Sequence, residues 1–323
     1  MLTSEWPDPY VSQTSHFIRR QAEFLQRAGV QLTVVAFRGA KNVRNYMRAW
    51  KDVRQRLRQQ TYDLIHAQFG QSGLLALPKK LPLVVTMRGS DVLGIVRDRD
   101  GRQSLAGRIL KRASRLVARS ADAVILVAPH LGDGLKTRAP AYVIPSGLDL
   151  SLFRPMNQTK ARRKLGFDGH EKLILFVGRP ATARKRFALA EQAVELLKTR
   201  MPARLVVAWS VSHRQVPVYM NACDALIFTS MQEGSPNVVK EALACNLPVV
   251  SVKVGDVPER LQDIEGCEVC ADHQPETIAA ALERVLTRGT RIKGVAAVRQ
   301  LDEKLMTRKV ISVYRTVLRR SRR

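Results

Sequence analysis

The chain has 323 residues, 45% hydrophobic and 25% charged, which suits two globular domains that each bury a substantial core. MLTSEWPD at the N-terminus lacks the apolar core of a secretory signal and no apolar run approaches the ~20 residues that span a bilayer, so we expect a cytoplasmic protein. The net charge of +26 favours an acidic partner, namely an anionic membrane, a nucleotide sugar, a lipid phosphate or nucleic acid, unless the whole proteome is basic.

The first predicted elements raise a difficulty at the N-terminus. An α/β domain of the nucleotide-binding type opens with a buried central strand, and this chain offers only residues 1–4 for it. Either the true start lies upstream of Met1, or the domain is damaged. After this, residues 12–28 predict a helix that ends at Gly29, and residues 30–37 predict a strand.

Two basic amphipathic helices follow, at residues 41–60 and 104–119. In the first, apolar residues recur at helical spacing while Lys and Arg crowd the remaining surface. One interpretation is that the apolar stripe packs against the sheet and the basic face is solvated. The alternative is that these helices lie on anionic lipid, at the inner face of the cell membrane.

Strands end near polar residues at two places between these helices. YDLIHAQFG predicts a strand that ends at His66 and a glycine-containing loop that continues to Gly73, and LPLVVTM runs directly into Arg88 and Asp91. Open α/β sheets bind ligands at the carboxyl ends of their strands, so both places are candidate site loops. AVILVAP and YVIP then predict the last strands of a domain that we assign to residues 1–150.

The second domain is assigned to residues 151–323, with a C-terminal return helix, after a linker at about 145–158 that contains Pro, Gly and Asn. It alternates again: a short helix at 160–165, the strand KLILFVGR, a basic loop and a helix to Leu197, then RLVVAW and VPVYMNACDALIF. Helices at 275–286 and 297–318 end the chain. CEVC contains a lone CxxC, Cys267 and Cys270, which is weak evidence for zinc or redox chemistry.

The stretch EGSPNVVKEALACNLPVVS lies between the strands ACDALIFTS and LPVVSV. Ser235 suits an N-cap and Pro236 the first helical position, so we predict a helix to about Cys245. Its free backbone N–H groups and dipole favour a phosphate. Glu233 stands on the turn and Glu241 about one and a half turns into the helix, where a carboxylate can accept hydrogen bonds from vicinal hydroxyls.

This E-x7-E string resembles the donor-site signature of the retaining GT-B glycosyltransferases of family 4. The resemblance implies an α/β fold of two doubly wound, Rossmann-like domains facing each other across a cleft. It also implies that Glu241 binds the nucleotide ribose and that Glu233 contacts the transferred sugar. Main-chain contacts to the diphosphate are assigned to Ser235, Asn237 and Val238. The alternative is a capped helix whose glutamates are solvated.

Other segments match the same family. The basic loop after KLILFVGR resembles the one whose cations bind the donor diphosphate, which points by position to Arg179 and Lys185, although Arg184 and Arg186 are close by. Two fixed cations stabilise charge that develops on a leaving diphosphate. VIPSGLDLSLFRP resembles the segment that closes the first domain. A solvated basic loop is the alternative.

The resemblance also extends to the acceptor side, with departures. Residues 13–15, Gln-Thr-Ser, occupy a loop that usually carries glycine, and Arg88 stands where many members have histidine. Arg88 then suits an acceptor phosphate or carboxylate, with Asp91 in the same loop. His66 either touches the sugar or acceptor or is hydrogen-bonded locally.

The resemblance implies a retaining transfer from a nucleotide diphosphate sugar to an acceptor hydroxyl, through front-face attack. The acceptor expected is a glycan or lipid-linked glycan of cell-envelope polysaccharide synthesis, with peripheral attachment to the membrane. No DxD motif is placed to hold a metal, so neither an essential metal ion nor a cofactor is expected. Two alternatives remain: a catalytically inactive GT-B protein, and a nucleic-acid-binding protein. Against the latter, aromatic residues make up only 6% and no helix-turn-helix, RRM or zinc-finger signature is visible.

Overall fold

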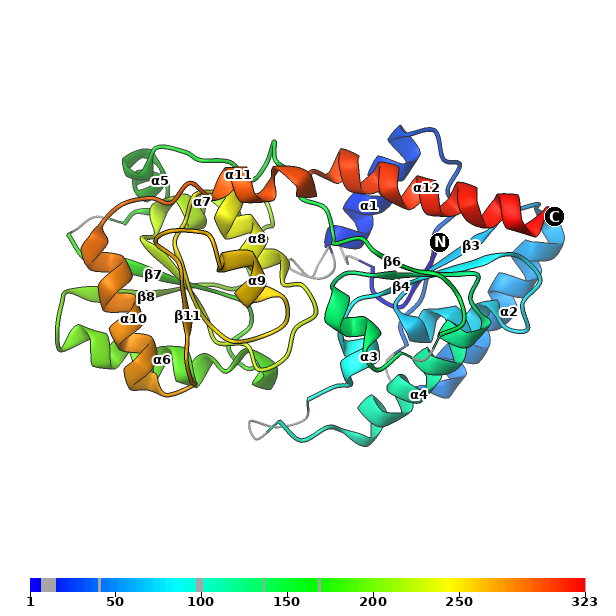
Figure 1. Cartoon of the computed structure of the whole chain (residues 1–323), viewed down its shortest axis with the longest axis horizontal. Coiled ribbons are helices and arrows are strands. Elements are labelled where there is room, and N and C mark those ends of the chain that lie inside the picture. Colours follow the sequence, from blue (N-terminus) through cyan, green and yellow to red (C-terminus); the bar gives the residue numbers. More distant parts are fainter. Residues whose placement is uncertain (7–15, 40–41, 97–100, 136, 168–169, 323) are drawn as a thin grey trace.

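Two parallel β-sheets with helices packed against them form the two halves of the computed structural model (Figure 1). The structure describes the whole chain except residues 7–15, 40–41, 97–100, 136, 168–169 and 323. Strand and helix alternate along both halves, because each parallel neighbour requires a crossover connection. The predicted α/β class with two doubly wound domains is therefore confirmed.

The first sheet has six strands in the order β2-β1-β3-β4-β5-β6. Its strands are β1 (Leu2–Thr3), β2 (Val35–Ala36), β3 (Ile65–Gln68), β4 (Leu83–Met87), β5 (Ala123–Leu126) and β6 (Ala141–Val143). The middle strands β3, β4 and β5 are buried along their whole length, as expected of a sheet covered on both faces.

The short first strand lies inside the sheet, between the edge strand β2 and β3, and not at the centre where it was expected. Leu2 pairs with Val35 on one side and with Ala67 on the other, so two residues of β1 join β2 to β3. The Met1 amino group donates to the Thr33 carbonyl at 2.6 Å, and burial lowers its pKa to about 5. The N-terminal residues therefore form a strand that is reduced in length but paired on both edges.

The helices of the first half divide between the two faces of its sheet. In Figure 1, α1 (His16–Arg27) and the last helix, α12 (Glu303–Ser321), lie together on one side. The other side carries α2 (Val43–Gln59), the 3-10 helix η1 (Gly70–Ala76), α3 (Ser90–Leu93), α4 (Leu105–Ser120) and η2 (Pro129–Gly132). A side chain at Gly70 or Gly73 would overlap Ser114 or Val117, so these two glycines let η1 pack closely against α4.

The second sheet has five strands in the order β11-β10-β9-β7-β8. Its strands are β7 (Lys172–Val177), β8 (Ala203–Ala208), β9 (Ala225–Phe228), β10 (Val249–Val252) and β11 (Glu268–Cys270). Its helices are α5 (Gln158–Leu165), η3 (Ala183–Lys185), α6 (Phe187–Lys198), α7 (Val216–Ala222), α8 (Asn237–Ala244), α9 (Val257–Leu261), α10 (Pro275–Arg288), α11 (Gly294–Val298) and η4 (Arg299–Leu301).

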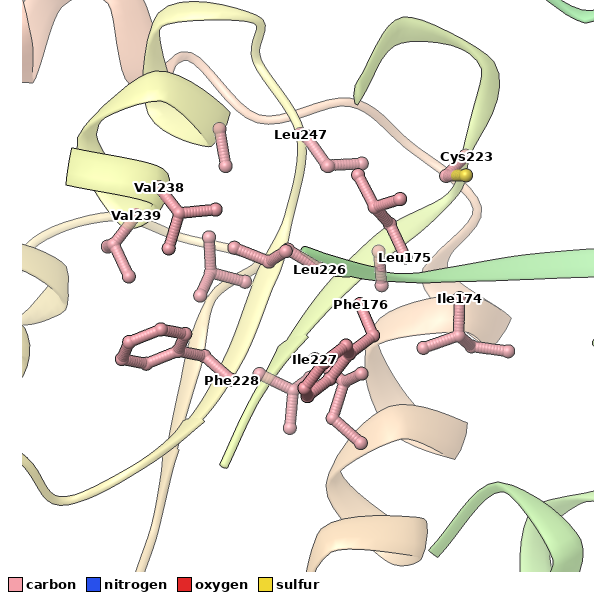
Figure 2. Close-up of a cluster of buried hydrophobic side chains, with 14 of the residues drawn as sticks. Ile174, Leu175, Phe176, Cys223, Leu226, Ile227, Phe228, Val238, Val239 and Leu247 are labelled. Atoms are coloured by element: carbon pink, nitrogen blue, oxygen red, sulfur yellow. The ribbon is translucent and has the colours of Figure 1, made fainter. Parts of the chain in front are cut away.

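The core of the second half fixes the position of α8. Figure 2 shows Val238 and Val239 of this helix beside Leu226 and Phe228 of β9, and all four side chains are buried. The turn between β9 and α8 is therefore attached at both ends to closely packed apolar residues. That packing holds the turn's polar residues in place at the carboxyl edge of the sheet.

The chain crosses between the two halves twice. Near the first crossing, Leu148 N donates to the Leu301 carbonyl at 2.8 Å, and Glu303 N donates to the Leu148 carbonyl at 2.9 Å. The second crossing leads into α12, whose Met306 and Val310 join a core cluster with Ile18 of α1. The last helix thus belongs structurally to the first half. None of the described helices combines the length and apolarity that crossing a bilayer requires.

A buried ion pair between α1 and α12 stabilises the region where the chain crosses between the halves. Arg20 of α1 donates from Nε to Glu303 at 2.8 Å and from Nη2 to the Gly147 carbonyl at 2.6 Å. Burial raises the pKa of Glu303, and the nearby Arg20 acts in the opposite direction. Both crossings are therefore joined to α1 by one guanidinium group.

Candidate donor and acceptor site

The turn after β9 ends one residue later than predicted. Pro236 has extended backbone angles (φ −68°, ψ 119°) and is the N-cap of α8, so Ser235 is not the cap and Pro236 is not in the first turn. The Ser235 hydroxyl instead accepts from Arg260 at 3.2 Å. Pro236 makes no side-chain capping bond, which leaves the first-turn amides of α8 available to an anion.

Glu233 forms the centre of a charged cluster beside this turn. Its carboxylate pairs with the guanidinium of Arg184 and with Lys185 Nζ at 3.3 Å. Burial alone would raise the pKa of Glu233, but Lys185 and Arg184 outweigh it and lower the pKa below its usual value. Burial lowers the pKa of Lys185, and Glu233 partly offsets that effect. The cluster brings one carboxylate and two cations to one edge of the sheet.

Glu241 lies on the same helix, in the buried part of the domain interface. Its carboxylate is 3.5 Å from His213 Nε2, and the His213 ring stacks on His16 of α1 with centroids 4.7 Å apart. Burial acts to raise the pKa of Glu241, but His213, Arg20 and Lys240 together lower it below its usual value. The charge of Glu241 also acts on Lys185. The two glutamates of the motif therefore share an electrostatic neighbour.

Two residues predicted for the donor site, Arg179 and Val238, have side chains outside the charged cluster around Glu233. Arg179 follows β7 and is exposed, with its guanidinium 5.8 Å from the centre of the Trp209 ring. The Val238 side chain packs in the core, so only its backbone amide faces the turn region. Arg186 donates to the Thr229 carbonyl at 2.7 Å, so its side chain stabilises the loop instead of pairing with Glu233.

Arg88 is the principal contribution of the first half. Its guanidinium donates to Gln68 Oε1 at 2.5 Å and to Ser146 Oγ at 2.8 Å, and it stacks 4.6 Å from the Phe17 ring centre. Burial lowers the pKa of Arg88 to about 10, with Asp91 acting in the opposite direction. The side chain is therefore a fixed cation at neutral pH, as binding of an acceptor phosphate or carboxylate would require.

His66 and Asp91 are both held by internal hydrogen bonds. His66 Nδ1 is 2.6 Å from the Tyr314 hydroxyl and Nε2 is 2.7 Å from the Thr86 hydroxyl, and burial lowers the pKa of the imidazole to about 3. The Asp91 carboxylate accepts from the backbone N–H groups of Gly70, Arg88 and Gly89 at 2.8 to 3.2 Å. His66 thus matches the locally bonded alternative, and Asp91 supports the loop that carries Arg88.

A cavity of about 420 Å³ lies between the two halves at this point. Arg88 lines it from the first half, and Arg184, Glu233, Ser235 and Asn237 line it from the second. Burial leaves the Asn237 side-chain oxygen without a hydrogen-bond donor among the described residues. The cavity is therefore faced by the Arg88 cation, by the Arg184–Glu233 pair and by the uncapped end of α8. Lys185, Glu241 and Arg179 lie outside its lining.

The two halves touch where this cavity closes. A Cβ atom on Gly234 would stand 2.5 Å from the Arg88 carbonyl and 3.3 Å from Gly89 Cα. Gln232 Nε2 donates to the Gly94 carbonyl at 2.8 Å across the same boundary. Glycine is thus required at position 234 for the closed arrangement.

Sequence reasoning missed the parts of this region that depend on tertiary placement. It selected Arg179 and Lys185 by position for the diphosphate; Lys185 contacts Glu233, and so does Arg184, which was named only as a close neighbour. It did not mention Lys240, which is fully buried on α8, donates to the Ser146 carbonyl at 3.2 Å and has a pKa lowered by burial to about 7. The loop of residues 13–15 lies outside the described residues.

Residues 14–152 match the family model described as Glycosyltransferase Family 4, and residues 209–288 match that described as Glycosyl transferases group 1. The chain belongs to these GT-B glycosyltransferases. The predicted family is therefore confirmed, and the second match includes the turn and helix that carry Glu233 and Glu241.

Curated relatives agree with this family. TuaC of Bacillus subtilis, named for teichuronic acid biosynthesis, is 32% identical over 60% of this chain and 54% of its own length. A D-inositol 3-phosphate glycosyltransferase of Geodermatophilus obscurus is 28% identical over 70% of this chain and 60% of its own length. The matching region thus spans little more than half the length of these relatives.

Solved structures show the same fold. Sucrose-phosphate synthase from Thermosynechococcus elongatus superimposes with a TM-score of 0.79 at 17% identity, covering 94% of this chain and 92% of that one. HepE of Anabaena, solved in complex with UDP and glucose, has a TM-score of 0.67 at 17% identity over 90% and 88% of the two chains. Both likenesses confirm the GT-B fold.

Proposed function

We propose that this glycosyltransferase-family protein transfers a sugar from a nucleotide diphosphate sugar to an acceptor hydroxyl. The main support for this proposal is the charged cluster that Glu233 forms with Arg184 and Lys185. This cluster lies beside the uncapped N-terminal end of α8 and opposite Arg88. Cations and helix amides suit a diphosphate, and a buried carboxylate suits hydroxyls. The UDP complex of HepE supports the choice of donor class.

The same cluster favours a retaining transfer without a covalent enzyme intermediate. The Glu233 carboxylate is paired with two cations and its pKa is lowered, so it is a weak nucleophile. We therefore assign it to orienting the sugar and the cations. Arg184 and Lys185 stabilise the charge that grows on the leaving diphosphate, whose oxygen takes the acceptor proton on the same face. With charge neutralised in this way, neither a divalent ion nor a cofactor is needed.

We assign the acceptor to the class of lipid-linked glycans. Arg88 provides a fixed cation at the cavity wall for a carboxylate or phosphate on the glycan part of the acceptor. The name of TuaC, which refers to teichuronic acid biosynthesis, supports a role in cell-envelope polysaccharide synthesis. Such acceptors are carried in a membrane, and the net charge of +26 suits attachment to an anionic leaflet from the cytoplasmic side.

Calorimetry of UDP, GDP and ADP and their sugars against the whole chain tests the donor assignment. We expect one nucleotide to bind in the micromolar range with EDTA present, and transfer to a lipid-linked acceptor to follow. Binding without any transfer would favour the catalytically inactive alternative. Absence of nucleotide binding, together with salt-sensitive binding to nucleic acid, would overturn the proposal.

Lys185→Ala and Arg184→Ala should lower the transfer rate more than the donor affinity, because the charge that they meet is largest in the transition state. We expect kcat to fall about a hundredfold while the nucleotide Kd changes by less than about tenfold. Arg179→Ala, at the cation that the family resemblance assigns to the same diphosphate, should behave in the same way. Arg163→Ala, at an exposed cation of α5, is the matched control. Equal losses in affinity and rate for Lys185 and Arg184 would mark both as plain binding residues.

A further inference from the structure

The apolar stripes of α2 and α4 are only partly buried. On α2, Ala49 and Val53 pack into the core, whereas Val43 and Met47 are 73% and 57% exposed. On α4, Ile109 is 58% exposed. Leu105 and Leu116 of α4 and Trp50 of α2 are exposed as well. Large apolar side chains that gather on one surface indicate a binding site rather than ordinary surface composition.

These side chains border a groove between the two helices. Figure 1 shows α2 and α4 on the same side of the first sheet, and η1 packs against both and forms the floor. The groove holds about 700 Å³, within the usual range for ligand pockets, and is lined mainly by Met47, Trp50, Leu74, Ile109 and Leu110. The Trp50 indole N–H donates to the Leu77 carbonyl at 2.8 Å, which satisfies the ring's one polar atom. The groove therefore suits a hydrocarbon chain.

Cations flank the exposed apolar residues on both helices. Arg44, Arg48 and Lys51 are exposed one turn apart on α2. Arg108, Arg112 and Arg115 are exposed at similar spacing on α4. An apolar groove between two rows of cations is complementary to an amphiphile that carries negative charge, such as a phosphate-bearing lipid.

One end of the groove shares a lining residue with the cavity between the two halves. Glu5 lines both the groove and that cavity. Ser4 and Gln71 line the groove at the same end, and Gln71 Nε2 donates to the Ser4 hydroxyl at 3.2 Å. Buried Gln71 Oε1 finds no donor among the described residues, which leaves an unpaired acceptor at this end of the groove. The groove thus changes from apolar to polar as it approaches the site.

We propose that this groove binds the hydrocarbon chain of the lipid-linked acceptor. The chain lies between α2 and α4, its phosphate meets the flanking cations, and its hydroxyl-bearing head passes Glu5 into the cavity between the halves. The proposal rests on the proposed function, because that function places the reacting hydroxyl in the cavity. It adds a site outside the donor cluster that selects acceptors by their lipid part.

Farnesyl phosphate, a short soluble isoprenoid phosphate, is the probe for a test on the full chain. We expect saturable binding by calorimetry, accompanied by a shift in tryptophan emission from Trp50. Met47→Gln with Ile109→Gln should weaken binding about tenfold or more, because apolar contacts to several chain carbons are lost. Both side chains are already largely exposed, so the variant should fold. Val143→Gln with Leu305→Gln, exposed apolar residues elsewhere, is the matched control.

A second variant tests the cations. Arg44→Gln, Arg48→Gln and Lys51→Gln together should weaken farnesyl phosphate binding and leave binding of uncharged farnesol unchanged. The matched control removes three exposed charges from α5 of the second half, at Lys160, Arg163 and Lys164. Equal weakening by both sets would show that only net charge matters and would overturn the proposed phosphate contact.

Donor binding separates this proposal from the proposed function. If UDP or another nucleotide binds and farnesyl phosphate does not, the groove assignment is wrong and the transferase proposal stands. If farnesyl phosphate binds through the groove and no nucleotide does, the groove stands and the transferase proposal fails. Binding to phosphatidylglycerol vesicles that depends on Met47 and Ile109 but is not displaced by farnesyl phosphate would mark a contact with bulk lipid and overturn the acceptor assignment.

Discussion

At the scale of single residues, the E-x7-E spacing was enough to locate Glu233 and Glu241, because both lie on or next to a helix whose packing the sequence pattern predicts. The cations were harder to assign. Arg179, Arg184 and Lys185 lie in one irregular loop, where side-chain direction depends on tertiary contacts rather than on a regular period. Only the structure shows that Arg184 pairs with Glu233 while Arg179 lies over Trp209.

Glu241→Ala should weaken binding of the nucleoside diphosphate without unfolding the domain. The lost carboxylate would remove one or two charge-assisted hydrogen bonds to the ribose, worth about 1.5 to 3 kcal/mol each. Calorimetry measures the change, with the exposed Glu276→Ala in the first turn of α10 as control. Unchanged affinity in the variant would show that the ribose contact is made elsewhere.

His66 predicts a pH dependence of stability. Its folded pKa of about 3 lies below the ordinary value near 6.5, so between these values the unfolded chain binds a proton that the folded chain does not. The contribution of His66 is complete above pH 6.5 and is lost as the pH falls, by about 2 kcal/mol at pH 5. In urea unfolding, His66→Gln should therefore show a smaller loss of stability between pH 7 and pH 5.

The control for this experiment is His170→Gln, which changes an exposed histidine of the second half. The control should keep the slope of the native chain. If His66→Gln keeps it as well, the protonation of other groups governs acid unfolding, and the hydrogen-bonded neutral imidazole is not the cause.

At the scale of elements, most helices and strands were predicted within a few residues, because both halves alternate regularly between buried strands and amphipathic helices. The prediction of η1 as a loop was less complete, since the sequence gives no apolar period there and the 3-10 helix depends on close packing of Gly70 and Gly73 against α4. The basic helix α2 was predicted from its stripe. Half of that stripe is exposed, which a periodic pattern alone does not reveal.

Asp91 connects two of these elements. Its carboxylate accepts from backbone amides in η1 and in the loop after β4, so Asp91→Ala would leave two buried N–H groups and one partly buried N–H group without an acceptor. We expect a loss of about 3 kcal/mol or more in the free energy of unfolding. Asp133→Ala, at an exposed aspartate of the same half, should change stability by less than about 0.5 kcal/mol. A small effect at Asp91 would mean that water replaces the carboxylate.

At the scale of the whole molecule, the sequence indicated two α/β halves, a linker near residue 150 and a C-terminal return helix, but not the residues that this helix contacts. The apolar residues of α12 follow the same helical period whichever half they cover. Their partners, Ile18 and Leu25 of α1, become visible only once the chain is folded. The closeness of Gly234 to Arg88 is likewise a property of the assembled halves, since neither segment requires it locally.

Gly234→Ala tests whether the closed arrangement is needed for transfer. The added methyl group would meet the Arg88 carbonyl, so the two halves should be held apart. A displacement of about 1 Å at a reacting centre can cost about a hundredfold in rate, so we expect a large loss of kcat. Small-angle scattering should show a larger radius of gyration in the variant. Gly134→Ala, where a Cβ has open space, is the control, and a variant with native kcat would exclude a role for this contact.

The paired crossings between the halves have a mechanical consequence. A single tether would let one body swivel freely about the other. Here the two connections run side by side and are hydrogen-bonded to each other through Leu148. The Arg20 guanidinium also bonds to both connections, at Glu303 and at Gly147. Two connections joined in this way resist rotation and sliding of one half against the other. They still allow the two halves to bend about the line of the connections. Donor entry and product release would then follow one bending coordinate, and its stiffness would be set far from the reacting groups.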